Sequence, residues 1–181
     1  MRKIILNAAV SLDGFIEGPN GEYDWCFNDQ DYGMTAFFEE TDAIFIGRKS
    51  FDMISADTSL FPVKMIYVFS DTLPDTQPEN VTVIRSADFD SMVDEVINGT
   101  GGNIWLFGGS DIISAMMNKN LVSEMLLAIH PVILGAGTPL FKNMKDRAGL
   151  TVLSQETYDT GLIQVRYSVK PRFDAEMMKL L

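Results

Sequence analysis

The segment 103–117 constrains the fold more strongly than any other stretch, because a strand, a glycine turn and a helix follow one another within it. Residues 104–107 are wholly apolar, which is typical of a short parallel strand covered on both faces. The next two residues, Gly108 and Gly109, allow a sharp turn and leave no side chain in the way of a ligand. Such a turn exposes N–H groups at the positive end of a helix, where phosphate binds, although most glycine pairs in this position only make a tight corner.

The same succession of strand, glycine or serine, and helix recurs along the chain. This alternation builds a mostly parallel central sheet with flanking helices, so the predicted fold class is α/β. Two alternating runs on either side of the turn 158–161 predict a C-terminal antiparallel hairpin. The predicted strands are 4–10, 43–46, 64–69, 81–84, 104–107, 124–129, 151–157 and 162–170, and the predicted helices are 32–40, 51–54, 88–97 and one that begins at 110 or 111.

Length and composition bound the architecture and exclude several classes of partner. With 181 residues, of which 46% are hydrophobic, the chain is long enough for one well-buried core and short for two, so we expect a single domain over residues 1–181. A formal net charge of −11 argues against a nucleic-acid or anionic-membrane partner. The single cysteine, Cys26, forms no internal disulfide, and no His or Cys cluster offers a metal site. Without a run that suits a signal peptide or a membrane span, a cytoplasmic protein is expected.

Two cations, Arg48 and Lys49, stand between a predicted strand and the start of a helix. The helix dipole disfavours cations at this end unless an anion lies between them and the free N–H groups, so the pair argues for bound phosphate; the alternative is that both are ordinary surface cations. Other candidates also follow predicted strands, at the edge where α/β sheets bind ligands. The candidate nucleotide site consists of Gly47, Arg48, Lys49, Ser50, Ser70, Arg85, Gly108, Gly109, Ser110, Asp111 and Ile112, of which Ser110 or Asp111 can also cap the helix.

Three further features each have two interpretations. Trp25 lies in a long loop that contains aromatic and acidic residues, which is either a binding loop or a surface excursion with the indole over the core. His130, the only histidine, is a candidate general acid, but a lone histidine beside a proline is more often a packed residue. The apolar residues of the tail 173–181 suit docking on its own sheet or on a second subunit.

Four motifs, in this order, resemble the dihydrofolate-reductase superfamily, and more narrowly the bacterial family similar to the C-terminal reductase domain of the riboflavin-biosynthesis deaminase/reductase. They are Ser11-Leu-Asp-Gly14, Asp42-Ala-Ile-Phe-Ile-Gly-Arg-Lys-Ser50, Trp105-Leu-Phe-Gly-Gly-Ser-Asp111 and Pro131-Val-Ile-Leu-Gly-Ala-Gly-Thr-Pro-Leu-Phe141. The resemblance covers nearly the whole chain. It implies a three-layer dihydrofolate-reductase-like fold, NADPH as the cofactor, hydride transfer to a small heterocyclic substrate, and a homodimer.

The resemblance also implies roles for individual residues. The backbone at Ala9 and Ile16 would hold the nicotinamide carboxamide, and Trp25 would border the substrate pocket. Residues 47–50 would bind the pyrophosphate and the 2′-phosphate, Ser70 would lie by the adenosine ribose, and residues 108–112 would cradle the pyrophosphate. Asp31 lies about where dihydrofolate reductases carry the acid that hydrogen-bonds the pterin and helps to deliver a proton; the alternative is that it caps a helix.

One departure bears on the substrate. Riboflavin-type reductase domains usually carry Glu immediately before the glycine pair, whereas this chain has Phe107, closer to the apolar residue of dihydrofolate reductases. The sequence also lacks a deaminase zinc signature, so the bifunctional enzyme is not expected. We therefore expect an NADPH-dependent reductase of a riboflavin-type aminouracil phosphate. The alternatives are a pterin reductase, a non-catalytic NADPH-binding protein of the same fold, and a flavin-binding flavodoxin-like module.

Overall fold

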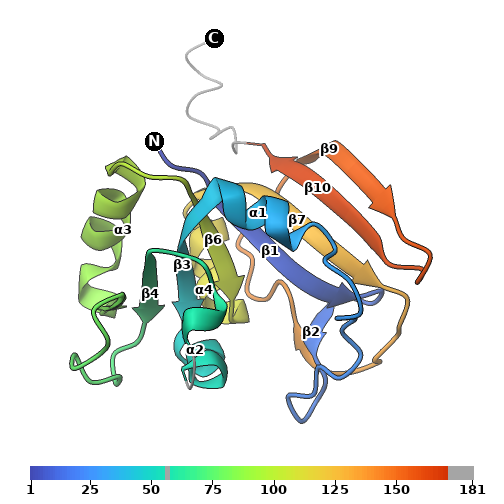
Figure 1. Cartoon of the computed structure of the whole chain (residues 1–181), viewed down its shortest axis with the longest axis horizontal. Coiled ribbons are helices and arrows are strands. Elements are labelled where there is room, and N and C mark those ends of the chain that lie inside the picture. Colours follow the sequence, from blue (N-terminus) through green and yellow to red (C-terminus); the bar gives the residue numbers. More distant parts are fainter. Residues whose placement is uncertain (56–57, 171–181) are drawn as a thin grey trace.

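A mostly parallel sheet forms the centre of the molecule (Figure 1). In this computed structural model, which describes residues 1–55 and 58–170, eight strands lie in the order β5-β4-β3-β6-β1-β7-β10-β9. The neighbouring strands from β5 to β7 are parallel, whereas β10 runs antiparallel to β7 and β9. The strands are β1 (Ile4–Ser11), β3 (Thr41–Gly47), β4 (Met65–Phe69), β5 (Val81–Ile84), β6 (Asn103–Gly108), β7 (Val122–His130), β9 (Leu150–Thr157) and β10 (Ile163–Val169).

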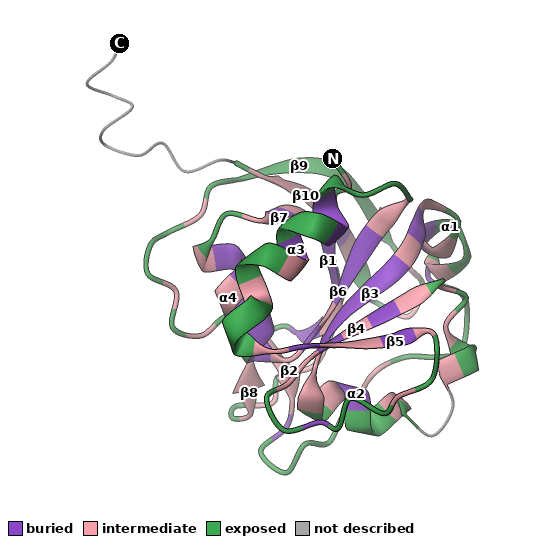
Figure 2. Ribbon diagram, turned by 90° about the vertical axis from the view of Figure 1, so that its left-hand side faces the viewer, coloured by how far each residue is buried: buried purple, intermediate pink, exposed green. Residues whose placement is uncertain are grey.

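Helices cover both faces of the sheet (Figure 2). One face carries α1 (Met34–Glu40) and α2 (Arg48–Ile54), and the other carries α3 (Phe89–Asn98) and α4 (Ser110–Asn118). Alternate residues of a strand point to opposite faces. Ile4 and Leu6 accordingly pack into the core beneath α3 and α4, whereas Ile5 packs with Phe37 and Phe51 beneath α1 and α2. The predicted three-layer α/β class and the C-terminal hairpin are confirmed.

The parallel arrangement brings several strand ends to one edge of the sheet. Gly47, at the end of β3, is aligned with Phe69 of β4, and Phe69 is aligned in turn with Ile84 of β5. On the other side of β3, Ile46 is aligned with Gly108, the last residue of β6. The segments that follow these strands therefore lie close together, although long stretches of sequence separate them.

Several boundaries differ from the sequence-based predictions. Helix α1 begins at Met34 instead of residue 32, because Tyr32 and Gly33 have positive φ angles of 48° and 77° that interrupt a helix. The segment 132–141, expected to be a loop, contains β8 (Thr138–Pro139), which pairs with β2 (Phe15–Glu17). Two short 3₁₀ turns are also present, Thr58–Leu60 and Ser86–Asp88.

Two further predictions concern the ends of helices and of the chain. The prediction that Ser110 or Asp111 caps α4 is wrong: Gly109 is the N-cap residue, and no side chain bonds the cap. Ser110 Oγ instead donates to the carbonyl of Pro139. The predicted helical tail 173–181 lies outside the described residues. Within the described residues, no helix has the length and apolar character needed to cross a bilayer.

Candidate functional site

A cavity of about 600 Å³ opens at the edge where β3, β4, β5 and β6 end. Its wall combines residues from the starts of α2 and α4, the turn after β4, and the β2–β8 pair. The predicted site residues that line it are Ile16, Gly47, Arg48, Lys49, Ser50, Ser70, Gly109, Ser110, Asp111 and Ile112. Ala9, Trp25, Asp31, Arg85 and Gly108 are predicted site residues that do not line this cavity.

The floor of the cavity depends on two glycines that touch across strands β3 and β6. A Cβ atom on Gly47 would lie 3.4 Å from the carbonyl oxygen of Gly108, and one on Gly109 would lie 3.8 Å from the Cα atom of Gly47. Gly109 also has a φ angle of 85°, a conformation that residues with a Cβ rarely adopt. The first N–H group of α4 bonded within the helix belongs to Ile113, which donates to the carbonyl of Gly109. The earlier N–H groups of α4 are left for a ligand, as at every helix start.

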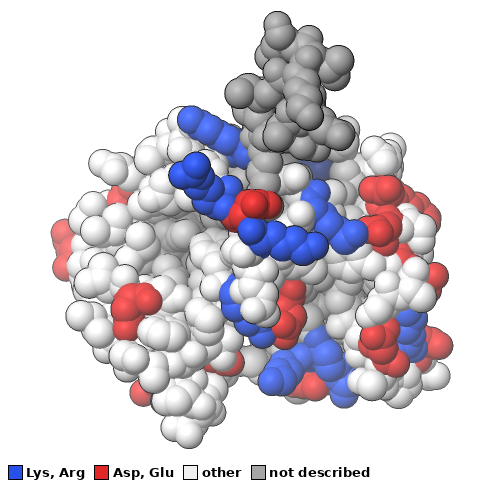
Figure 3. Space-filling model, turned by 180° about the vertical axis from the view of Figure 1, so that it is seen from behind, with Lys and Arg blue, Asp and Glu red and all other residues white. Residues whose placement is uncertain are grey.

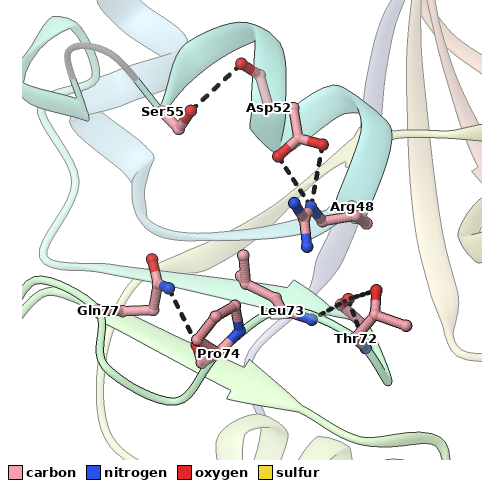
Figure 4. Close-up of polar contacts among 8 residues, drawn as sticks. Arg48, Asp52, Ser55, Thr72, Leu73, Pro74 and Gln77 are labelled. Atoms are coloured by element: carbon pink, nitrogen blue, oxygen red, sulfur yellow. Dashed lines mark hydrogen bonds and ion pairs between the residues drawn. The ribbon is translucent and has the colours of Figure 1, made fainter.

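Arg48 already has an anionic partner in the absence of any ligand. Its Nε atom lies 2.8 Å and 2.9 Å from the two carboxylate oxygens of Asp52, one turn further along α2 (Figure 4). Because Asp52 already pairs with Arg48, this cation is weaker evidence for a bound phosphate at the start of α2. Lys49 has no ion pair within the described part of the chain, so the argument applies to its ammonium group.

The turn after β4 forms the wall opposite α2, and its own hydrogen bonds hold it. Ser70 Oγ accepts the backbone N–H groups of Thr72 (3.2 Å) and Leu73 (3.0 Å). Arg85 donates from Nη1 to the carbonyl of Ser70 (2.8 Å) and pairs with the carboxylate of Asp75, so it braces the turn from outside the cavity. This geometry assigns Arg85 a supporting position, unlike the cofactor contact expected from its place after a strand.

Besides Asp111, which was predicted as a site residue, the cavity is lined by two acids that the sequence analysis did not single out, Glu17 and Asp71. Asp71 accepts the backbone N–H of Ser86 (2.7 Å) and the Ser86 hydroxyl (2.5 Å), and these bonds hold the pKa of the Asp71 carboxyl below its ordinary value. Asp111 pairs with Lys142 at 2.7 Å. A residue directly after Ser70 could have been considered at the sequence level, whereas Lys142 carries no local signal because it follows no predicted strand.

The cavity is electrically neutral in an acidic molecule. The described lining contains as many cations as acids, whereas the whole chain carries a formal charge of −11. Seen from behind, many of the basic side chains lie in the middle of the face, with some acids among them and others toward its margins (Figure 3). The charged residues of the lining are Arg48, Lys49, Lys142, Glu17, Asp71 and Asp111.

Trp25 and His130 form a separate packed cluster. The Trp25 ring meets the imidazole edge-on, with 5.3 Å between ring centroids. His130 is buried; its Nε2 atom accepts the backbone N–H of Phe27 (3.1 Å), so Nδ1 carries the proton that bonds the carbonyl of Ala128 (3.0 Å). Burial lowers the pKa of His130, which keeps it neutral. These bonds support the packed interpretation of the histidine and attach the Trp25 loop to the end of β7.

Asp31 lies at the start of α1, in full contact with solvent. Its Oδ1 atom accepts the backbone N–H (3.0 Å) and the hydroxyl (2.8 Å) of Thr35. Hydrogen bonds from Thr35 lower the pKa of the Asp31 carboxyl, so it is ionised near neutral pH. The N-cap residue of α1 is Gly33, so Asp31 bonds the first turn of the helix without occupying the cap position that the alternative assigned to it.

Comparisons with known proteins place this geometry in a family. The model of the RibD C-terminal domain matches residues 2–164. The chain is 40% identical to the uncharacterized protein YyaP of Bacillus subtilis over 179 residues, covering 92% of this chain and 94% of that protein. The structure of a putative riboflavin biosynthesis protein from Shewanella sp. PV-4 matches with a TM-score of 0.78 at 28% identity, over 93% of this chain and 99% of that one.

A further structure shows how widely the fold is shared. Dihydrofolate reductase from Enterococcus faecalis, complexed with NADP(H) and RAB-propyl, matches with a TM-score of 0.68 over 93% of this chain and 97% of that one. At 17% identity this likeness concerns the fold alone. The match over residues 2–164 shows that this chain, which has a dihydrofolate-reductase-like fold, belongs to the RibD C-terminal domain family.

Proposed function

We propose that the protein is an NADPH-dependent reductase that binds its cofactor in the cavity at the carboxyl edge of the sheet. The proposal rests on one observation: Arg48, Lys49 and the start of helix α4, whose N-cap residue is Gly109, line the same cavity. Cationic side chains and free backbone N–H groups are the two kinds of group that bind phosphates. Family membership and the NADP(H) complex of the Enterococcus reductase support the same cofactor.

The residues of the cavity fit a phosphorylated dinucleotide. The volume of the cavity, about 600 Å³, falls in the usual range of cofactor sites, and the absence of Cβ atoms lets the backbones at Gly47 and Gly109 pack closely against each other in its lining. We assign the 2′-phosphate to the side of Arg48, Lys49 and Ser70, and the pyrophosphate to the start of α4. Because the Asp111 carboxylate would repel a phosphate, Asp111 contributes through its backbone N–H while Lys142 neutralises its side chain.

When bound, NADPH supplies a hydride to a carbon of a C=N or C=O group. The chain's own residues orient the two reactants and exclude water. We propose that the backbone at Ala9 and Ile16 lies beside the nicotinamide and that Trp25 and Asp31 lie toward the substrate. Since the Asp31 carboxyl is ionised, its proposed role is to accept a hydrogen bond from a substrate N–H group.

For the substrate, we propose a riboflavin-type aminouracil phosphate, which the family and the Shewanella relative support. Phe107 favours the second candidate, a pterin, because it stands where riboflavin-type reductase domains usually carry Glu, and its ring packs among other aromatic residues. The centroid of Phe107 is 4.8 Å from that of Trp105 and 5.8 Å from that of Phe61.

The proposal is tested by titrating the purified protein with NADPH while recording tryptophan fluorescence, and then following oxidation of the dihydronicotinamide with aminouracil phosphates and pterins. Binding and turnover of one substrate class are expected. Binding of NADPH without turnover would favour the non-catalytic NADPH-binding protein. A yellow protein that does not bind NADPH would favour the flavin-binding module.

We also propose a cytoplasmic homodimer. All eight residues of β9, the outermost strand of the sheet, are exposed, among them the apolar residues Leu150, Val152 and Leu153. An exposed apolar edge is a ready site for pairing with another strand, here that of a second copy. Sedimentation analysis should show a dimer that Leu153→Lys converts to a monomer, and a dimer retained by this variant would place the contact elsewhere.

A further inference from the structure

The charged residues of α2 do not lie at the helix ends where they would stabilise it. A helix is stabilised by acids in its first turn and by cations in its last, and α2 has neither. It carries Arg48 as its first residue and Asp52 near its end, and a cation that precedes an acid by four residues is the weaker order for such a pair. Both side chains are well exposed, at 38% and 51%, and exposed pairs contribute little to stability. Stability of the helix is therefore a poor explanation for this pair.

The geometry of the pair is more informative. Both hydrogen bonds to Asp52 come from the Nε atom of Arg48. Within residues 1–55 and 58–170, neither Nη atom of Arg48 makes a hydrogen bond. Figure 4 shows one end of the guanidinium group pointing away from α2, across the gap toward the turn that carries Thr72 and Leu73. Asp52 thus holds the inner edge of the guanidinium and leaves its outer edge available.

The wall that faces Arg48 is also fixed before any ligand arrives. Ser70 Oγ accepts two backbone N–H groups of its own turn, and Asp71 is held by Ser86. The two sides of this part of the cavity consequently need little rearrangement to receive an anion. Long side chains such as arginine lose conformational entropy when a ligand immobilises them, and fixing them beforehand avoids that loss.

From these observations we infer that Asp52 is a positioning residue, which holds Arg48 in the orientation that binds the 2′-phosphate of NADPH. This inference rests on the proposed function, because it presupposes that the phosphate binds beside Arg48. It adds that selectivity for NADPH over NADH depends on a residue that need not touch the cofactor. The competing effect is the negative charge of Asp52, which repels a phosphate and would make its removal favourable.

Two substitutions separate position from charge. Asp52→Asn removes the charge but retains an oxygen that accepts the Arg48 Nε–H, whereas Asp52→Ala removes both. The dissociation constants for NADPH and NADH are measured by fluorescence titration for the wild type and both variants. We expect Asp52→Ala to bind NADPH roughly three- to tenfold more weakly than Asp52→Asn, since the arginine must then be ordered on binding. NADH, which has no 2′-phosphate, should bind all three proteins alike.

The effect should also require Arg48. In an Arg48→Ala background, Asp52→Ala and Asp52→Asn are expected to bind NADPH equally, because no arginine is left for residue 52 to position. The four proteins form a double-mutant cycle that measures this coupling. If Asp52→Ala binds NADPH as tightly as Asp52→Asn, or weakens NADH to the same extent as NADPH, Asp52 does not position the arginine. Either result leaves the proposed function intact, whereas a wild-type protein that binds no NADPH would remove both proposals.

Discussion

The proposed 2′-phosphate contact makes Arg48→Ala a decisive substitution. Hydrogen bonds between charged groups contribute about 1.5–3 kcal/mol, and Arg48 keeps both Nη groups available for a phosphate. Because the side chain is 38% exposed, solvent screening places the loss at the lower end, about 1.5–2 kcal/mol. Each 1.4 kcal/mol changes a dissociation constant tenfold, so NADPH should bind roughly 10- to 30-fold more weakly. NADH should bind about as well as it does to the wild type.

Tryptophan fluorescence can follow this experiment, because the chain contains two tryptophans. Lys64→Ala is the matched control, since Lys64 is also a cation paired with an aspartate, Asp42, but directly precedes β4, at the opposite edge of the sheet from the cavity. It should leave the ratio of the two dissociation constants unchanged. Equal losses of NADPH and NADH in Arg48→Ala would refute the reasoning, and so would a change of selectivity in Lys64→Ala of the same size as that in Arg48→Ala.

The remaining predictions concern stability. Gly109→Ala should lower the free energy of unfolding by about 1–3 kcal/mol in urea titrations, because the φ angle of Gly109 is 85°. Gly47→Ala is the control and should lower it less, since the φ angle of Gly47 is −76°. Equal losses of unfolding free energy in the two variants would show that the φ angle is not the cause. His130 has a folded-state pKa below its unfolded value, so its contribution is complete above about pH 6.5 and is lost as the pH falls toward the folded pKa. Unfolding free energies of the wild type should therefore decrease from pH 7 to pH 5, and His130→Gln should flatten that decrease; an unchanged slope would contradict the neutral, packed histidine.

Local sequence signals were enough to predict most of the sheet. The segment 81–84 consists of β-branched residues, which favour strands, and it forms β5 with those same limits. The hairpin of β9 and β10 was predicted from alternation, because the side chains of a strand point to its two faces in turn. The helix starts were less accurate: α2 begins at Arg48, ahead of its first apolar residue, since a helix can begin wherever the backbone allows it and periodicity marks only the face that is buried.

The partners of individual side chains could not be predicted in the same way. Asp52 lies on the predicted helix of Arg48, yet only the rotamers of the two side chains show that the acid holds Nε and leaves the outer edge available. Lys142 reaches Asp111 from a segment with no strand or helix of its own, and Arg85 turns outward to Asp75 instead of into the cavity.

The sequence by itself determined the α/β class, the succession of strands and helices along the chain and the glycines at the ends of β3 and β6, because strand and helix periodicity and glycine turns are properties of neighbouring residues. The tertiary structure decided which of the residues after these strands share a cavity, which cations already have an anionic partner, and that the single histidine is packed. These outcomes depend on contacts between residues far apart in the chain, and the free energy of such contacts is set by distance and burial, which no local pattern encodes.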